Sequence, residues 1–122
     1  MTSQVKGRLL TKEDENTKRL IDLQRRIHED YESISPLFHI YRVIILSHVA
    51  VQTRSFKELK LITTLSDGNL ASHLRPLDQL GMIKVIKGYE GRIPKTTYEI
   101  TKKGKESLDK MRKIFDEVAY HL

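Results

Sequence analysis

The strongest constraint on the fold is the order of four short segments between residues 55 and 101. The motif SFKE at 55–58 has the serine and glutamate of a capping box, which satisfies free amides at the start of a helix. Thr63-Thr64 interrupts that helix after about two turns. Ser66 caps a second helix, which we expect to run to about Leu80 and to end at Gly81 in the left-handed conformation.

The residues that follow change from helical to strand-like composition. MIKVIK (82–87) is rich in β-branched residues, and TTYEI (96–100) predicts a second strand. Between them, GYEGRIPK (88–95) contains two glycines and a proline, which predicts a long hairpin loop. Two short helices joined by a tight turn and followed by a hairpin are the layout of a winged helix-turn-helix. The expected fold class is therefore mainly α with a small β-hairpin.

Three more helices are expected around this unit. Thr11 can cap a charged helix that extends through about Ser33. Ser35-Pro36 supplies an N-cap and a first helical position for a buried core helix, and Thr101 caps the last helix. The expected organisation is a loose arm (1–10), an N-terminal helix (11–34), a winged helix-turn-helix domain (35–101) and a C-terminal helix (102–122).

Both terminal helices carry narrow apolar stripes. The first is too charged to form a core helix alone, and the last repeats apolar residues at heptad steps of three and four. We expect them to form an intersubunit layer in a C2 homodimer, and the alternative is that both fold back on their own domain. The predicted dimerisation residues are Leu20, Leu23, Ile27, Tyr31, Leu108, Met111, Phe115, Val118 and Leu122.

Composition excludes several classes of protein. The length of 122 residues suits one domain, and the absence of cysteine excludes disulfides and thiolate metal sites. The histidines have no ligand-like spacing, and no nucleophile elbow, phosphate loop or HExxH motif is present, so we expect no metal, no cofactor and no enzyme activity. Without a signal-like stretch or an apolar run of about 20 residues, we expect a cytoplasmic, nucleoid-associated protein.

The positive charge is concentrated in the hairpin region. The net charge of the chain is +6, yet residues 1–34 carry seven basic and seven acidic side chains. Residues 82–105 carry seven basic against two acidic side chains, a local excess of five. A basic patch of this kind is the electrostatic footprint of a polyanion-binding protein, although a solvated lysine-rich surface gives the same pattern.

The second short helix has two different faces at about 100° per residue. Leu70, Leu74 and Leu77 define the side that is expected to be buried. The opposite side carries small or hydrogen-bonding residues, which suit close approach to base edges in a major groove. We expect Gly68, Asn69, Ser72 and Arg75 to contact DNA. His73 lies at the edge of the buried face, and we expect it to be a packing or hydrogen-bonded histidine. Pro76 should bend the helix.

The stretch from Leu65 to Gly104 resembles the recognition helix and wing of small MarR/ArsR-like winged-helix transcriptional regulators. The matching pieces are Leu65-Ser66-Asp67-Gly68-Asn69-Leu70, His73-Leu74, Leu77, Leu80-Gly81, Gly91-Arg92, Pro94, Thr97-Tyr98, Ile100-Thr101 and Gly104. This resemblance implies a dimeric DNA-binding regulator with Tyr89, Arg92 and Lys95 on the wing. Pro76 departs from the lysine or similar residue that is common at that position.

The sequence therefore predicts a protein that binds double-stranded DNA. Lys84, Lys87 and Lys95 can meet phosphates, and Arg92 can enter a minor groove unless it pairs with Glu90. The preferred hypothesis is a sequence-specific transcriptional regulator that represses by occluding a promoter. The alternatives are a sequence-tolerant architectural DNA-binding protein and a winged helix used for protein interaction.

Overall fold

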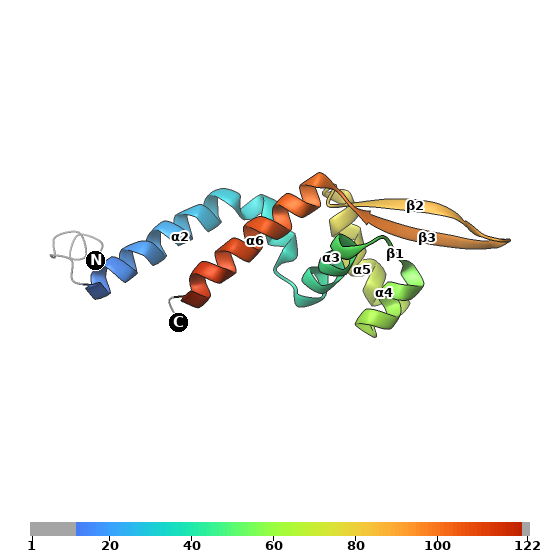
Figure 1. The fold of residues 1–122 in the computed structure, drawn as a ribbon, viewed down its shortest axis with the longest axis horizontal. Coiled ribbons are helices and arrows are strands. Elements are labelled where there is room, and N and C mark those ends of the chain that lie inside the picture. The colour runs from blue at the N-terminus through green and yellow to red at the C-terminus, as the bar shows by residue number, and fades with distance from the viewer. Residues whose placement is uncertain (1–11, 121–122) are drawn as a thin grey trace.

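A computed structural model describes residues 12–120, which form helices around a small antiparallel sheet (Figure 1). This confirms the expected mainly helical α+β class and the winged-helix layout. In chain order the elements are α2 (Lys12–Ile34), the 3-10 turn η1 (Ser35–Leu37), α3 (Ile40–Val51), β1 (Arg54–Ser55), α4 (Phe56–Thr63), α5 (Asp67–Gln79), β2 (Ile83–Glu90), β3 (Ile93–Ile100) and α6 (Lys102–Tyr120). The predicted arm over 1–10 and Leu122 lie outside the described residues.

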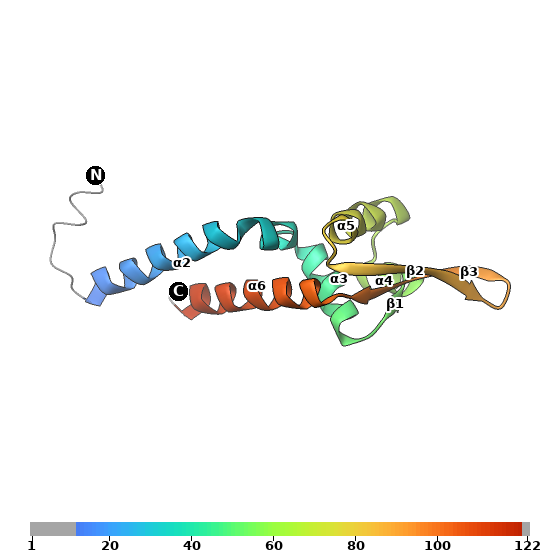
Figure 2. The same cartoon turned by 90° about the horizontal axis from the view of Figure 1, so that it is seen from above.

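The molecule is elongated. Helices α2 and α6 lie side by side and antiparallel at one end, and the β2–β3 hairpin projects from the other end (Figures 1 and 2). A small apolar cluster joins the two helices, formed by Leu23, Ile34 and Ile114 with Ile27 and Val118 packed against it. Arg26 on α2 forms a two-pronged ion pair with Glu117 on α6, and Lys110 pairs with Asp30 at 3.5 Å. We call this α2–α6 unit the helical arm.

The main core lies between the helices and the base of the hairpin. Its buried side chains come from η1, from helices α3 to α6, from strands β2 and β3 and from the connection before β2: Leu37, Ile45, Leu46, Val49, Leu59, Leu70, Leu74, Leu77, Met82, Ile83, Tyr98 and Met111. The three leucines predicted for the inner face of the second short helix are all among them. That face therefore holds α5 against the domain and fixes which side of α5 is exposed.

The start of the core helix differs from the prediction. Ser35-Pro36 forms a separate 3-10 turn, and Phe38 then interrupts the helical path. Helix α3 begins only at Ile40, with extended His39 as its N-cap and His39 Nδ1 accepting a hydrogen bond from Tyr41 N at 3.3 Å. A histidine cap was not expected because serine before proline is the stronger N-terminal signal.

The long hairpin loop that we predicted over 88–95 is wrong. Strands β2 and β3 continue through it and pair up to Glu90 and Ile93, so that only Gly91-Arg92 forms the turn. Gly91 has φ +64°, and a positive φ at the first turn residue only is the pattern of a type II′ hairpin. Pro94 is tolerated because alternate residues of a strand turn their amides to opposite edges. Ile93 forms the pair that closes the hairpin, so the backbone nitrogen of Pro94 points away from β2, toward the other edge of β3. Strand β1 pairs with that edge only at Thr97 and Tyr98, so no hydrogen bond is lost at Pro94.

A third strand, β1, was also missed. Arg54 and Ser55 pair with Tyr98 and Thr97, which gives the sheet order β1-β3-β2. Ser55 is at the same time the N-cap of α4, and the predicted capping box with Glu58 is present. A strand of two residues leaves no periodic signal in a sequence. Its role is to tie the start of α4 to the base of the hairpin.

The connection from α5 to the sheet and from the sheet to α6 is compact. Gly81 has φ +72°, as predicted for the residue that ends the helix. The Thr101 hydroxyl accepts a hydrogen bond from Gly104 N at 3.0 Å, which is the cap expected at the start of α6, and it donates to Gly81 O. A Cβ atom at Gly104 would lie 2.1 Å from Met82 O. Helix α6 can dock this closely only because Gly104 has no side chain.

Among residues 12–120, no single helix is long and apolar enough to cross a membrane. Only Asp14–Leu37 and Ile40–Val51 taken together meet that measure of length and composition, and they are bent by 81°.

Candidate nucleic-acid interface

Helix α5 presents a weakly helix-forming but well-capped first turn. Ser66 is extended and its hydroxyl accepts a hydrogen bond from Asn69 N at 3.2 Å, as the sequence predicted. Gly68 is exposed, and a Cβ atom built there meets nothing within 4 Å. The domain therefore imposes no packing reason for glycine at this position.

The predicted contact residues share one exposed face. Gly68, Asn69, Ser72 and Arg75 are all exposed on α5. The Ser72 hydroxyl donates to Asn69 O at 2.7 Å, so its proton is used within the helix and its oxygen is left as an acceptor. The side-chain amide of Asn69 forms no hydrogen bond with any described residue, which leaves both its NH2 donor and its oxygen acceptor available. Asn69 is thus the residue of this face best able to make a bidentate contact.

Helix α5 passes through Pro76 without a break and ends at Gln79.

The first turn of α5 contains an acidic residue whose role the sequence analysis did not predict. Asp67, in the first turn, forms an ion pair with Lys60 of α4 at 2.8 Å. Acids are favourable in a first turn, where the helix dipole is positive, and this pair also links the two helices of the motif. The signal was Asp67 directly after the Ser66 cap.

The wing distributes its cations unequally. Lys84, Lys87, Tyr89 and Arg92 are exposed, whereas Lys95 is less exposed and pairs with Glu90 at 3.4 Å. The anticipated pairing of Glu90 with Arg92 is not found. Within residues 12–120, no carboxylate pairs with Arg92, Lys84 or Lys87. None of these three cations forms an ion pair, although Lys84 lies opposite Glu99 in the hairpin, whereas the charge of Lys95 is neutralised by Glu90.

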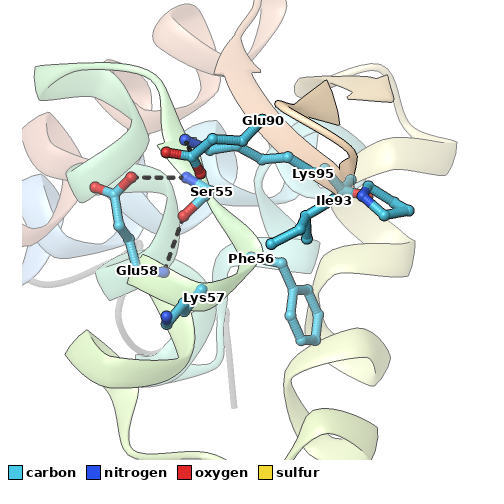
Figure 3. A pocket seen from close by; sticks show the side chains of 9 residues that line it. Ser55, Phe56, Lys57, Glu58, Glu90, Ile93 and Lys95 are labelled. Carbon is cyan, nitrogen blue, oxygen red and sulfur yellow. Dashed lines mark hydrogen bonds and ion pairs between the residues drawn. The ribbon is translucent and has the colours of Figure 1, made fainter. Parts of the chain in front are cut away.

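Lys95 lines a groove of about 570 Å³ (Figure 3). The groove lies between the start of α4 and the outer half of β3, and the Lys95 side chain extends toward the capping box of Ser55 and Glu58. Hydrogen bonds from Ser55 lower the pKa of Glu58, and the charges of Arg54 and Lys95 lower it further. Lys95 is thus paired with Glu90 across the hairpin and lies close enough to Glu58 of α4 for its charge to act on that carboxylate. The groove carries both acids and bases and has no net preference for anions.

Ring-bearing and basic side chains meet where the inner flank of α5 lies against the start of α3. We call this group the histidine–arginine cluster, and its members are His39, Tyr41, Arg42 and His73. The His39 and His73 rings are 4.3 Å apart, and Arg42 Nε donates to His73 Nδ1 at 3.3 Å. Burial lowers the pKa of His73, and the charges of His39 and Arg42 lower it further. His73 is therefore the hydrogen-bonded histidine that its place on the helix predicted.

The predicted dimerisation residues fall into two groups. Leu108 and Met111 pack on the main core, while Leu23, Ile27 and Val118 fill the small cluster inside the helical arm. Leu20, Tyr31 and Phe115 are 42%, 54% and 55% exposed. Sequence reasoning missed further large apolar side chains on the same part of the chain, namely Ile21, Phe38, Ile40 and Tyr120, all at least 48% exposed.

Comparisons with known proteins agree with this architecture. A family model described as "winged helix DNA-binding domain" matches residues 42–118, more than half of the chain. No curated protein matches the sequence significantly. Several solved structures are similar, and at these identities the likeness shows the fold alone.

One similar structure is a transcriptional regulator homologue from Pyrococcus horikoshii OT3, with 22% identity and a TM-score of 0.61 over 81% of this chain and 92% of that one. A MarR-family protein from Porphyromonas gingivalis W83 has 22% identity and a TM-score of 0.60, over 75% and 90% of the two chains. The regulator BldR from Sulfolobus solfataricus has 17% identity and a TM-score of 0.58, over 90% and 83%. The fold is thus the MarR-like one that the recognition helix and wing predicted, and the chain belongs to the winged helix DNA-binding domain family.

Proposed function

We propose that this chain is a sequence-specific transcriptional regulator that represses by occluding a promoter. In this proposal α5 enters the major groove and the wing follows the backbone into the minor groove. The observation that carries it is the outward face of α5, which is small and hydrogen-bonding where stability alone would favour alanine, lysine or glutamate.

The proposed base contacts come from the first half of α5. Asn69 is suited to adenine, to whose N6 and N7 it can bond in a bidentate manner, and Arg75 is suited to guanine or to a phosphate. Gly68 leaves room for the groove wall, and the Ser72 oxygen can accept a hydrogen bond from a base amino group. These contacts would specify sequence.

The proposed wing contacts are mainly electrostatic. Arg92 in the tight turn can insert in a narrow minor groove, where the potential is most negative. Lys84 and Lys87 can meet phosphates, and Tyr89, which is 77% exposed, can pack against the sugar edge. Each phosphate contact would add about one unit to the salt slope of binding.

We further propose a C2 homodimer formed by the helical arm. Helix α2 buries part of its apolar stripe against α6, and three further apolar residues of this helix, Leu20, Ile21 and Tyr31, remain exposed. The two recognition helices would then contact half-sites about 34–36 Å apart, one turn of DNA. Such a dimer predicts an inverted-repeat site.

The decisive experiment is a footprint on the DNA upstream of the protein's own gene, at moderate salt and with competitor DNA. Protection of a discrete inverted repeat is the expected result. Uniform coating of the DNA would identify a sequence-tolerant architectural protein instead. Absence of binding even at low salt would leave the winged helix as a protein-interaction module.

A further inference from the structure

The flank of α5 opposite the wing carries the histidine–arginine cluster. Arg75 lies on the wing side of α5, where it lines a depression with Asp78, Val85 and Tyr98. His73 lies on the other side, one turn after Asn69, and contacts the start of α3. A helix in the major groove has a phosphate backbone on each side. The wing can serve only one of them.

The histidine–arginine cluster contains a cation without a counterion. Arg42 is half-buried and donates to His73 Nδ1 and, through Nη1, to Pro36 O at 3.3 Å. No carboxylate within residues 12–120 pairs with it, in contrast to Arg26, Arg54 and Arg112. Its two neutral acceptors fix the guanidinium in place, and among the described side chains no carboxylate compensates its charge and no acceptor bonds its Nη2. A fixed, unpaired guanidinium is a preorganised site for a phosphate.

The two histidines add directed donors. His39 Nδ1 accepts from Tyr41 N, and His73 Nδ1 accepts from Arg42 Nε, both at 3.3 Å. An imidazole nitrogen that accepts a hydrogen bond carries no proton, so each neutral ring carries its proton on Nε2. The Nε2 atoms are on the ring edges turned away from these partners. His39 is exposed, which makes its Nε2–H accessible from solvent.

We propose that the histidine–arginine cluster binds a DNA phosphate on the strand that flanks α5 opposite the wing. Arg42 supplies the charge, and the Nε2–H groups of His39 and His73 supply two directed hydrogen bonds. This inference rests on the proposed DNA-binding function and adds to it a second backbone anchor. With the wing on one side and the cluster on the other, α5 would be held in register between the two strands.

The test uses a duplex that the wild-type protein selects from a randomised pool. Single phosphates of this duplex are replaced in turn by uncharged methylphosphonate, and dissociation constants are measured by fluorescence anisotropy. For the wild type, one position per half-site should cost on the order of tenfold in affinity. Arg42→Gln should lower affinity for the unmodified duplex by a similar factor, reduce the salt slope by about one unit per half-site, and abolish the penalty at that position.

Two further variants separate contact from folding. Asparagine carries an acceptor near the place of Nδ1, so His39→Asn with His73→Asn keeps the α3 cap and the Arg42 contact and removes both Nε2–H groups. It should weaken binding several-fold while the urea midpoint stays close to that of wild type. Arg112→Gln removes an equal charge from an arginine already paired with Asp109 at 2.8 Å, and it should leave the phosphate scan unchanged.

The outcomes separate the two proposals. If the wild type selects a duplex but Arg42→Gln shows the same methylphosphonate profile, the cluster does not bind phosphate and the proposed function stands. The same holds if the double asparagine variant binds as tightly as wild type. If the wild type binds no duplex at low salt, both proposals fall.

Discussion

Gly68 is the residue for which helix stability and the proposed DNA binding most clearly favour different side chains. A Cβ there would meet no atom within 4 Å and its φ is not in the left-handed region, so Gly68→Ala should stabilise the protein by up to about 0.5–1 kcal/mol. The same methyl group would stand on the face proposed to approach the groove, and DNA affinity should fall. Urea unfolding and anisotropy titration measure the two effects. A more stable variant with undiminished affinity would remove Gly68 from the interface.

Arg92 and Lys95 provide a matched comparison within one hairpin. Arg92→Ala removes an uncompensated charge, so it should weaken binding to all sequences and lower the salt slope by about one unit per half-site. Lys95→Ala removes a charge already neutralised by Glu90 at 3.4 Å, and its effect should be clearly smaller. Salt-dependent titrations of both variants decide the point. Equal losses would show that the Lys95–Glu90 pair opens on DNA.

At the same scale, Asn69→Ala should relax base preference at one position of each half-site. Base preference is compared by repeating the selection from a random pool with the variant. Because the Asn69 side chain bonds no described group, and the backbone amide of residue 69 still donates to the Ser66 hydroxyl, the fold should not change. An unaltered consensus would mean that Asn69 reads no base.

At the scale of elements, the sequence predicted the helices that depend on local signals. The capping box at Ser55 and Glu58, the cap at Ser66 and the left-handed Gly81 are interactions within one turn, and all three are present. The wing loop was predicted wrongly because Gly88 and Pro94 read as turn residues. In the structure, both residues are paired within the hairpin despite their low β-propensity. Pro94 lies where its missing amide costs no hydrogen bond between the strands, and at Gly88 there is no neighbouring side chain to contact.

The relations that depend on distant residues could not be predicted. Strand β1 is defined only by its partner β3, more than forty positions later in the chain. The histidine–arginine cluster brings His39 and His73 together across three elements, and no spacing in the sequence reports that contact. The division of the apolar stripe on α6 between core, arm and surface likewise depends on where α2 lies.

The close docking of α6 on the domain can be tested by substituting Gly104. Gly104→Ala would place a methyl carbon 2.1 Å from Met82 O and 3.0 Å from the Ile100 side chain, so α6 must shift. Overpacking of this kind costs about 1–3 kcal/mol, which a lower urea midpoint would report. Gly88→Ala is the control, because nothing lies within 4 Å of its Cβ position and stability should be unchanged or slightly raised. Equal midpoints for the two variants would contradict this account of the α6 junction.

At the scale of the whole molecule, several large exposed apolar residues lie on or beside the helical arm. Helix α2 is a charged helix whose apolar stripe is only partly covered by α6. Ile21 and Tyr31 line an open groove together with Ile27, which also packs on the cluster inside the arm. Tyr31 also stacks obliquely on Phe38 at 6.2 Å, which extends this surface to the base of the arm. A second copy of the same face would cover it by twofold symmetry.

The oligomeric state therefore provides the last prediction. Wild-type protein should sediment as a dimer at tens of micromolar, and Ile21→Glu combined with Phe115→Glu should produce a folded monomer, because each carboxylate would be buried unpaired in the interface. Leu61→Glu is the matched control: Leu61 is 72% exposed, more than Ile21 at 52% or Phe115 at 55%, but it lies on α4, away from the arm. It should remain dimeric. The arm variant should also lose its preference for a duplex with two half-sites over one half-site, because the two recognition helices would no longer be linked. A wild-type monomer at these concentrations, or an arm variant that still dimerises, would place the interface elsewhere or remove it.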